Sequence, residues 1–488
     1  SELAGAIKSA YTYDSFGNLK SKVDSRAFAA ISDDSIGSIA TRESLGIHKV
    51  AAELTSLEKS QIVNYFTATF NYDKLDRKIS EVDGNSKKIS NTYDGFGNLT
   101  YTTDKNENGG SFIFNGANQL WISIDPENGL MLYDYDVYGN ITTTTAVAET
   151  QEKNEITSYG YDNLGRVKTT VNAEGYFEIN SYDAFGNKIK VDRQINKSAS
   201  PISYEYIYDK AGRMVYEKLP VHTDKSTELQ PTDTQVVNAT FYDALGNATD
   251  KYQGYGLLEQ QHTEYEFDLL GRLDTQHDDF VLGQTEKGLT KHSYDSQGNL
   301  VQVENALSEI TTNYYDRANR LIGQVDTEGY LHEYTYDTAG NLVYKKVFKE
   351  PVEGNVKINQ IPAMHGDAEY HEDYFYYDLA GREIGHKTQE VNLFDSLQIN
   401  SPLTDSGFYK DQVHTKKFYD ANGNLVKETD GRNSSIYHIY DKAGREVATI
   451  DAAGSMVTKE YNLTGKMVKE IQYAGQLSSA TCAGLTQD

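Results

Sequence analysis

Two stretches of the sequence carry residues of the types that bind metal ions. The first, "DKNENG", copies the opening half of an EF-hand calcium loop, with Asp104, Asn106 and Asn108 as oxygen ligands. The bidentate Glu that closes such a loop should stand at its twelfth position, which holds Asn115. An ordinary hairpin turn explains the same residues, because the interval from Asp104 to Asn115 is also the spacing between two turns of the repeat described below. We favour the turn, with calcium as the alternative.

The second stretch, "MHGDAEYHEDYF", offers His365, Asp367, Glu369, His371 and Asp373 at alternate positions. On a strand these side chains would share a face, as a zinc or nickel site needs. The spacing is not H-E-x-x-H, and an exposed polar insertion explains it as well. Any metal site here would centre on His365, Asp367 and His371.

Nucleophilic catalysis has no support in the sequence. The one cysteine, Cys482, lies in a tail of small residues, the 11 histidines are scattered, and no G-x-S-x-G motif occurs. A single cysteine also excludes a disulfide within the chain. We therefore expect no enzymatic activity and no cofactor.

The composition excludes further classes of protein. The formal charge is −26 and Lys and Arg do not cluster, which disfavours nucleic acid as a partner. No apolar run approaches the ~20 residues of a membrane-spanning helix. The chain starts without Met or a secretion signal, so we expect an excerpt of a longer protein.

The elements that must position these residues come from a repeat. An aromatic residue followed by Asp or Asn, two variable residues, usually Gly, and then Asn or Arg recurs in 17 copies, and eight of the intervals are 21 residues. The copies begin at Tyr13, Tyr72, Tyr93, Phe114, Tyr135, Tyr161, Tyr182, Tyr208, Tyr242, Phe267, Tyr294, Tyr315, Tyr336, Tyr377, Tyr419, Tyr440 and Tyr461.

Each copy predicts two short antiparallel strands joined by two turns. A second turn follows the first by ten or eleven residues, as Asp326 follows Asp316, which leaves six or seven residues per strand. In D-x-x-G the Asp accepts a backbone hydrogen bond, and Gly takes positive φ as a bulge. The turn residues chosen on this basis are Asp94, Gly97, Asn98, Asp162, Gly165, Arg166, Asp316, Arg320, Asp337, Gly340, Asn341, Asp441, Gly444 and Arg445.

The residue that closes each first turn alternates between Asn and a longer side chain over sixteen copies. Examples are Asn299, Arg320, Asn341 and Arg382. We therefore predict a structural unit of ~42 residues in which every second turn Asp receives a charge-assisted hydrogen bond from Arg.

The turn register predicts that one sheet face carries a stripe of tyrosines and aliphatic residues. Around "YTYDTAGNLVY" we expect Tyr334, Tyr336, Leu342 and Tyr344 on that face. Such aromatic side chains pack against each other in most sheets, but they also stack on sugars or hold another polypeptide. These four residues are the candidate binding face.

Four long gaps interrupt the repeat, at about 25–64, 218–238, 348–372 and 386–415, and we interpret them as insertions within one array over residues 1–488. In the first, "GIHKVAAELTSLEKSQI" places Ile47, Val50, Ala51, Leu54 and Leu57 on one helical face. One short helix is expected there.

The copies "YDTAGNL", "YDNLGRV" and "YDKAGRE", with second turns such as "VDTEG", resemble the Rhs/YD-repeat family over nearly the whole chain. That family includes bacterial Rhs polymorphic toxins, the B and C components of insecticidal toxin complexes, and the teneurins. The resemblance implies an all-β fold of tandem antiparallel hairpins in a long curved ribbon, which spirals into a hollow shell and in the toxins encloses an effector.

Family toxins end the shell with a D-P-x-G-L segment and an autocleaving protease site. Here the nearest string, "DPENGL" at Asp125 to Leu130, is mid-chain, so neither protease nor effector is assigned. About 34 strands at ~4.8 Å spacing would make a strip ~160 Å long that closes once near 50 Å in diameter.

The function expected from the resemblance is a non-catalytic wall segment of a large bacterial protein that is secreted or displayed at the cell surface. It would encapsulate or present another polypeptide, either a cargo or another segment of the same long chain. The alternative is an adhesin-like module that binds carbohydrate through its tyrosine face.

Overall fold

The structure is a computed structural model that describes residues 8–150, 153–195, 197, 200–224, 232–257, 260–278, 288–394, 408–478 and 481. Cys482 and parts of two predicted insertions, residues 225–231 and 395–407, lie outside the described residues.

The described chain is built mainly on one antiparallel sheet of 34 strands, which confirms the predicted all-β hairpin fold. Each strand pairs with the next in sequence, except that β16 pairs directly with β19. The strands β17 and β18 form a separate two-stranded hairpin.

The strands have the following bounds. The first half comprises β1 Ala10–Tyr13, β2 Leu19–Val23, β3 Thr67–Tyr72, β4 Lys78–Val82, β5 Lys88–Tyr93, β6 Leu99–Thr103, β7 Gly109–Phe114, β8 Leu120–Ile124, β9 Leu130–Tyr135, β10 Ile141–Ala146, β11 Glu155–Tyr161, β12 Val167–Val171, β13 Phe177–Tyr182, β14 Lys188–Arg193, β15 Ile202–Tyr208, β16 Met214–Lys218, β17 His222–Asp224 and β18 Thr232–Thr234. The second half comprises β19 Val237–Tyr242, β20 Ala248–Gln253, β21 Gln261–Phe267, β22 Leu273–Asp278, β23 Gly288–Tyr294, β24 Leu300–Glu304, β25 Ile310–Tyr315, β26 Leu321–Val325, β27 Tyr330–Tyr336, β28 Leu342–Pro351, β29 Tyr370–Tyr377, β30 Glu383–Phe394, β31 Phe408–Tyr419, β32 Leu425–Thr429, β33 Ser435–Tyr440, β34 Glu446–Ile450, β35 Ser455–Tyr461 and β36 Met467–Gln476.

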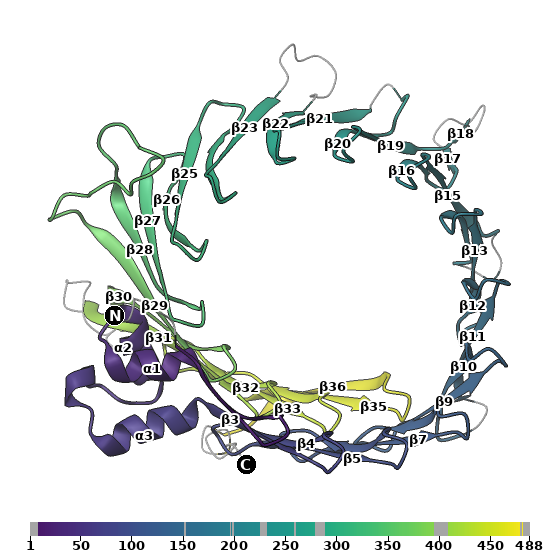
Figure 1. The fold of residues 1–488 in the computed structure, drawn as a ribbon, viewed down its shortest axis with the longest axis horizontal. Coiled ribbons are helices and arrows are strands. Elements are labelled where there is room, and N and C mark those ends of the chain that lie inside the picture. Colours follow the sequence, from purple (N-terminus) through teal and green to yellow (C-terminus); the bar gives the residue numbers. More distant parts are fainter. Residues whose placement is uncertain are drawn as a thin grey trace.

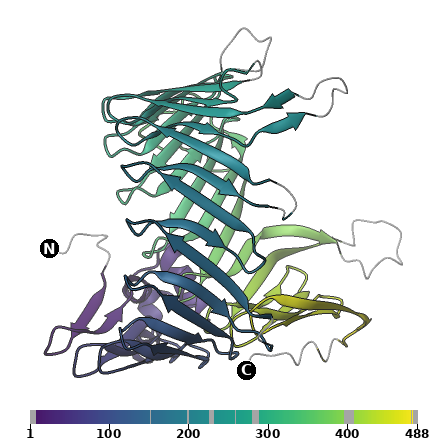
Figure 2. The same cartoon turned by 90° about the vertical axis from the view of Figure 1, so that its right-hand side faces the viewer.

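The ribbon curls into a ring and then overlaps itself (Figure 1), so that the turns after β31, β33 and β35 contact the segments that follow β6, β8 and β10. The side view shows that the path is a spiral (Figure 2). Counting sheet strands from β7 to β31, and leaving out the separate β17–β18 pair, gives 23 per coil. At ~4.8 Å per strand this corresponds to a diameter of about 35 Å, tighter than the 50 Å predicted for all 34 strands in one turn.

The tighter curvature has a local cause in the repeat itself. At every first turn the strand register shifts by one residue just before the repeat aromatic, as between Tyr314 and Tyr315 and between Thr335 and Tyr336. A bulge of this kind bends its strand and raises the twist. Because the bulge recurs on the same edge in each hairpin, the bends add up along the ribbon.

The first insertion contains three helices rather than the one predicted: α1 Ser25–Ser32, α2 Ile36–Ser44 and α3 Ser56–Tyr65, with a 3-10 turn η1 Ala51–Glu53. The predicted position was partly wrong, because α3 begins only after Thr55, whose hydroxyl and Glu58 form a capping box. Leu54 is buried as expected, whereas Leu57 is 69% exposed.

These helices enclose a small apolar core of their own. Ala27, Ala30, Leu54, Ile62 and Phe66 form it, and Leu379 from a repeat turn packs against it. The insertion is therefore attached to the turn between β29 and β30 as well as to β2 and β3, which flank it.

Two later insertions extend strand pairs. The segment between β28 and β29 folds back so that Ile361 and Met364 cover a core of Tyr314, Leu331 and Phe348. The strands β30 and β31 continue their pairing as far as Phe394 and Phe408. Among the described residues, no helix has the length and apolar character needed to cross a membrane.

Candidate functional site: the repeat turns, the seam and a basic pocket

Each repeat turn is held by its first residue, an aspartate or, at Asn115 and Asn462, an asparagine, in the way the sequence predicts. In the turn after Tyr336, Asp337 Oδ1 accepts hydrogen bonds from the N–H groups of Ala339 and Asn341, at 2.9 and 2.8 Å, and Oδ2 accepts from Asn341 Nδ2 at 2.8 Å. Gly340 adopts φ +95°, the left-handed region that favours glycine. These residues act as turn formers, and the turns at Asp94 and Asp162 repeat the pattern.

Arginine in alternate turns makes three interactions, only the first of which the sequence predicts. Arg320 bonds Asp316 Oδ2 through Nε and Nη2, at 2.8 and 2.7 Å. Its Nη1 donates to the Asp337 carbonyl of the next repeat turn at 2.9 Å, and its guanidinium lies 5.0 Å from the Tyr336 ring. Carboxylate pairing and stacking on the following repeat tyrosine recur at Arg77, Arg166, Arg213, Arg272, Arg382 and Arg445.

The repeat tyrosines bond to the neighbouring hairpin. Tyr336 donates its hydroxyl to the Leu321 carbonyl at 2.8 Å, and Tyr315 donates in the same way to the Leu300 carbonyl at 3.1 Å. The same bond is made by Tyr93, Tyr135, Tyr161, Tyr182, Tyr208, Tyr242, Tyr377, Tyr419, Tyr440 and Tyr461. The tyrosine of the motif thus fastens successive hairpins together.

The candidate binding face is only partly assembled. Tyr336 pairs with Leu342, as predicted, but Lys345 rather than Tyr344 lies opposite Tyr334. Tyr344 pairs with Thr335, which puts it on the opposite face, because the bulge adds one residue to the strand. There its ring lies 5.0 Å from that of Tyr374, and its hydroxyl donates to Glu372.

The last coil of the ribbon meets the first coil along a polar seam, which sequence reasoning missed. Asn422 Nδ2 donates to Asp104 Oδ2 at 2.6 Å, and Asn106 Nδ2 donates to Asp420 Oδ2 at 2.9 Å. Lys466 pairs with Glu155 at 2.9 Å. The bonds across the seam join residues 309 to 318 positions apart, so repeat turns of the last coil lie on second turns of the first coil.

The third residue of each repeat turn does not by itself locate the seam. Where the turn lies on the seam this residue is small or polar: Asn422, Ala443 and Thr464. In other turns it is large and exposed, as in Phe96 at 88% and Phe185 at 93%, or small, as in Ala211 and Ala318. Close approach of the two coils therefore coincides with small or polar side chains, but such side chains also occur away from the seam.

The candidate metal ligands from the sequence make ordinary turn and ion-pair contacts in the structure. Asp104 accepts backbone bonds from Asn106 and Asn108 as an ordinary turn aspartate, and its Oδ2 faces the seam. His365 contacts Glu353 at 3.3 Å, and His371 contacts Asp373 at 3.4 Å. The described residues contain no cluster of three or more His, Cys, Asp or Glu that could hold a metal ion.

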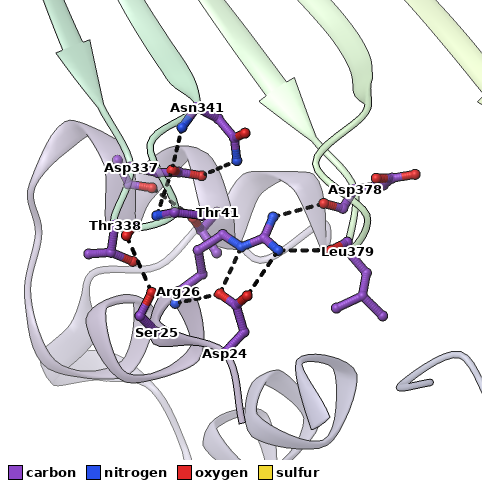
Figure 3. A network of polar contacts seen from close by, with 11 residues as sticks. Asp24, Ser25, Arg26, Thr41, Asp337, Thr338, Asn341, Asp378 and Leu379 are labelled. Carbon is purple, nitrogen blue, oxygen red and sulfur yellow. Dashed lines mark hydrogen bonds and ion pairs between the residues drawn. The ribbon is translucent and has the colours of Figure 1, made fainter. Parts of the chain in front are cut away.

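The helical insertion reaches the same edge of the ribbon further along (Figure 3). Arg26, 5% exposed, donates to the backbone carbonyls of Asp378 and Leu379 at 2.9 and 2.8 Å, while Asp24 pairs with its Nε. Gly37 brings α2 so close to the Asp337 turn that an added Cβ would lie 3.0 Å from Asp337 Cα. Two repeat turns are thus covered by helices instead of by another coil.

A pocket of about 660 Å³ opens where this insertion meets β29–β31. Basic side chains line much of it: His48, Arg382, Lys387, His414, Lys416 and Lys417. Burial, and next the charges of Lys416 and Lys387, lower the pKa of His414. Burial and the neighbouring Glu43 carboxylate raise the pKa of Tyr376, whose hydroxyl donates to Glu43 at 3.0 Å.

Comparison with known proteins agrees with this geometry. The family model described as the teneurin YD-shell matches residues 220–487, more than half of the sequence. The chain belongs to the teneurin YD-shell family, whose repeats build a structural shell. No curated protein is significantly similar to the sequence.

Three solved toxin structures align with the chain. A Tc holotoxin pore of Photorhabdus luminescens aligns at 16% identity and a TM-score of 0.47, covering 84% of this chain and 24% of that one. A TcdB2-TccC3-TEV structure aligns at 14% identity and 0.46, covering 97% and 28%, and a TcdB2-TccC3 structure at 14% and 0.44, covering 95% and 28%. The chain thus spans about a quarter of the length of these proteins.

Proposed function

We propose that the chain is a non-catalytic wall segment of a secreted shell that encloses polypeptide. The observation that carries the proposal is the seam: a ribbon whose last coil docks on its first coil makes a continuous wall rather than an open strip. The alternating Asn and Arg turns, the tyrosine bonds and the seam side chains all serve that wall. Family membership supports the shell, and the enclosed polypeptide is the step we add.

We infer that the enclosed polypeptide is another segment of the same polypeptide chain. The coil is about 35 Å in diameter, measured from backbone to backbone. This leaves room inside it for a polypeptide that has no large hydrophobic core of its own. The carbohydrate alternative receives no support from the repeat tyrosines, since their hydroxyls are bonded to neighbouring hairpins.

Limited proteolysis of the intact parent protein tests this proposal. We expect at least one segment outside residues 8–478 to resist protease while the ribbon is folded, and to be cleaved once urea unfolds the ribbon. The control is the same segment expressed alone, which should be cleaved at once. Equal cleavage rates for the segment alone and within the parent would refute enclosure.

A further inference from the structure

The basic pocket lies between the helical insertion and the β30–β31 hairpin, outside the regular contacts between repeats. Regular repeats pack against one another without such a pocket. It forms where the helical insertion meets the extended β30–β31 hairpin. Its basic character also runs against the formal charge of −26 on the whole chain. A local positive site on an acidic protein selects an anionic ligand.

The acidic groups at the pocket are already engaged by neighbours. Asp378 accepts from Arg382, Glu383 accepts from Lys417, and Glu43 accepts from Tyr376. Lys387 and Lys416 pair with no carboxylate in the part of the chain that the structure describes. These two ammonium groups are therefore available to a ligand.

The strand register fixes how the two lysines lie. Lys387 pairs with His414 and Gly385 pairs with Lys416, so the lysines are diagonal neighbours on one face of β30 and β31. Diagonal positions of this kind are about 7–8 Å apart. Alternate side chains of an extended peptide are separated by about 6.6 Å, which is close to the same spacing.

We propose that this pocket binds an extended acidic segment of polypeptide that carries carboxylates on alternate residues. Lys387 and Lys416 each receive one carboxylate, and the aromatic wall that includes Tyr376 and Phe418 packs against the backbone between them. A volume near 660 Å³ lies in the range of pockets that hold ligands of a few residues. The proposal is independent of whether the shell encloses a polypeptide.

Fluorescence anisotropy with a labelled alternating Glu-Ser octapeptide tests the proposal on the whole chain. We expect saturable binding that weakens about tenfold in the double variant Lys387→Gln/Lys416→Gln. The control, Lys20→Gln/Lys168→Gln, removes the same charge from exposed strand positions and should change the affinity less than about twofold. Glu43→Gln removes a carboxylate from the pocket wall and should tighten binding.

Three results would overturn the proposal. One is no saturable binding at low salt, and another is equal weakening by the two double variants, which would mean diffuse attraction. The third is competition by citrate or inorganic phosphate at the same concentration of negative charge, because the pocket would then be a simple anion site. Circular dichroism of each variant confirms that the comparison is made between folded proteins.

Discussion

Replacing Arg320 by Met tests whether arginine in alternate turns holds successive hairpins together. The substitution removes the pair with Asp316, the hydrogen bond to the Asp337 carbonyl and the contact with Tyr336. The ion pair, with side chains 31% and 21% exposed, contributes about 0.5–1 kcal/mol. The hydrogen bond adds about 1 kcal/mol and the ring contact about 0.5 kcal/mol. We expect a loss of about 2 kcal/mol.

Two matched variants separate these contributions. Asp316→Asn should cost only about 0.5–1 kcal/mol, because Asn115 and Asn305 already form the same turn elsewhere in the chain. Arg193→Met, which removes an arginine that is 51% exposed and pairs with Glu178, should cost less than about 0.5 kcal/mol.

The assay must report locally, because a repeat array unfolds in parts. Amide hydrogen exchange of the hydrogen-bonded strands β25–β27 gives the free energy of local opening, and urea unfolding gives the global effect. If Arg320→Met and Arg193→Met lowered the opening free energy of their own strands equally, the three-way role of the arginine would be refuted.

Three further predictions concern the repeat. Tyr336→Phe should lower the free energy of unfolding by about 1 kcal/mol in urea melts, since it removes the bond to Leu321, whereas Tyr138→Phe at an 87% exposed site should change nothing measurable. Gly340→Ala, at φ +95°, should cost about 1 kcal/mol, and Gly116→Ala, which lacks positive φ and has open space around it, much less; equal losses would contradict the turn geometry. Turn aspartates such as Asp183 have a pKa below the usual value, because the Asn187 side chain donates to the carboxylate. A depressed pKa gives stability that is present above the unfolded value of about 4 and is lost as pH falls through the folded value, so the urea midpoint should hold from pH 7 to 5 and drop below about pH 4.

The repeat made the hairpin fold predictable from sequence. Turn hydrogen bonds are local, so the residues of one copy determine the bonds of Asp337, Gly340 and Asn341. The alternation of Asn and Arg along the copies indicated the ion pair between Arg320 and Asp316. The second and third contacts of Arg320 were missed because they reach the next hairpin, whose distance depends on sheet twist. The predicted sheet face of Tyr344 was wrong for a related reason, because a one-residue bulge moves the following side chains to the other face of the sheet.

The seam and the pocket could not be predicted in the same way. Both join residues about 310 or more positions apart, as Lys466 and Glu155 or Arg26 and Leu379 do, and that separation depends on accumulated curvature. In the helical insertion, sequence reasoning also failed over a shorter separation. Its apolar pattern indicated a helix, but the cap at Thr55 determined where α3 begins.

Zero-length carbodiimide cross-linking of Lys466 to Glu155 in the monomeric protein tests the spiral wall most directly. Their side chains lie 2.9 Å apart, although the residues are 311 positions apart in sequence. The cross-strand pair Lys218 and Glu205, 3.3 Å apart within one hairpin, is the internal control. The coiled arrangement predicts both linked peptides. Recovery of the Lys218–Glu205 link without the Lys466–Glu155 link would contradict it.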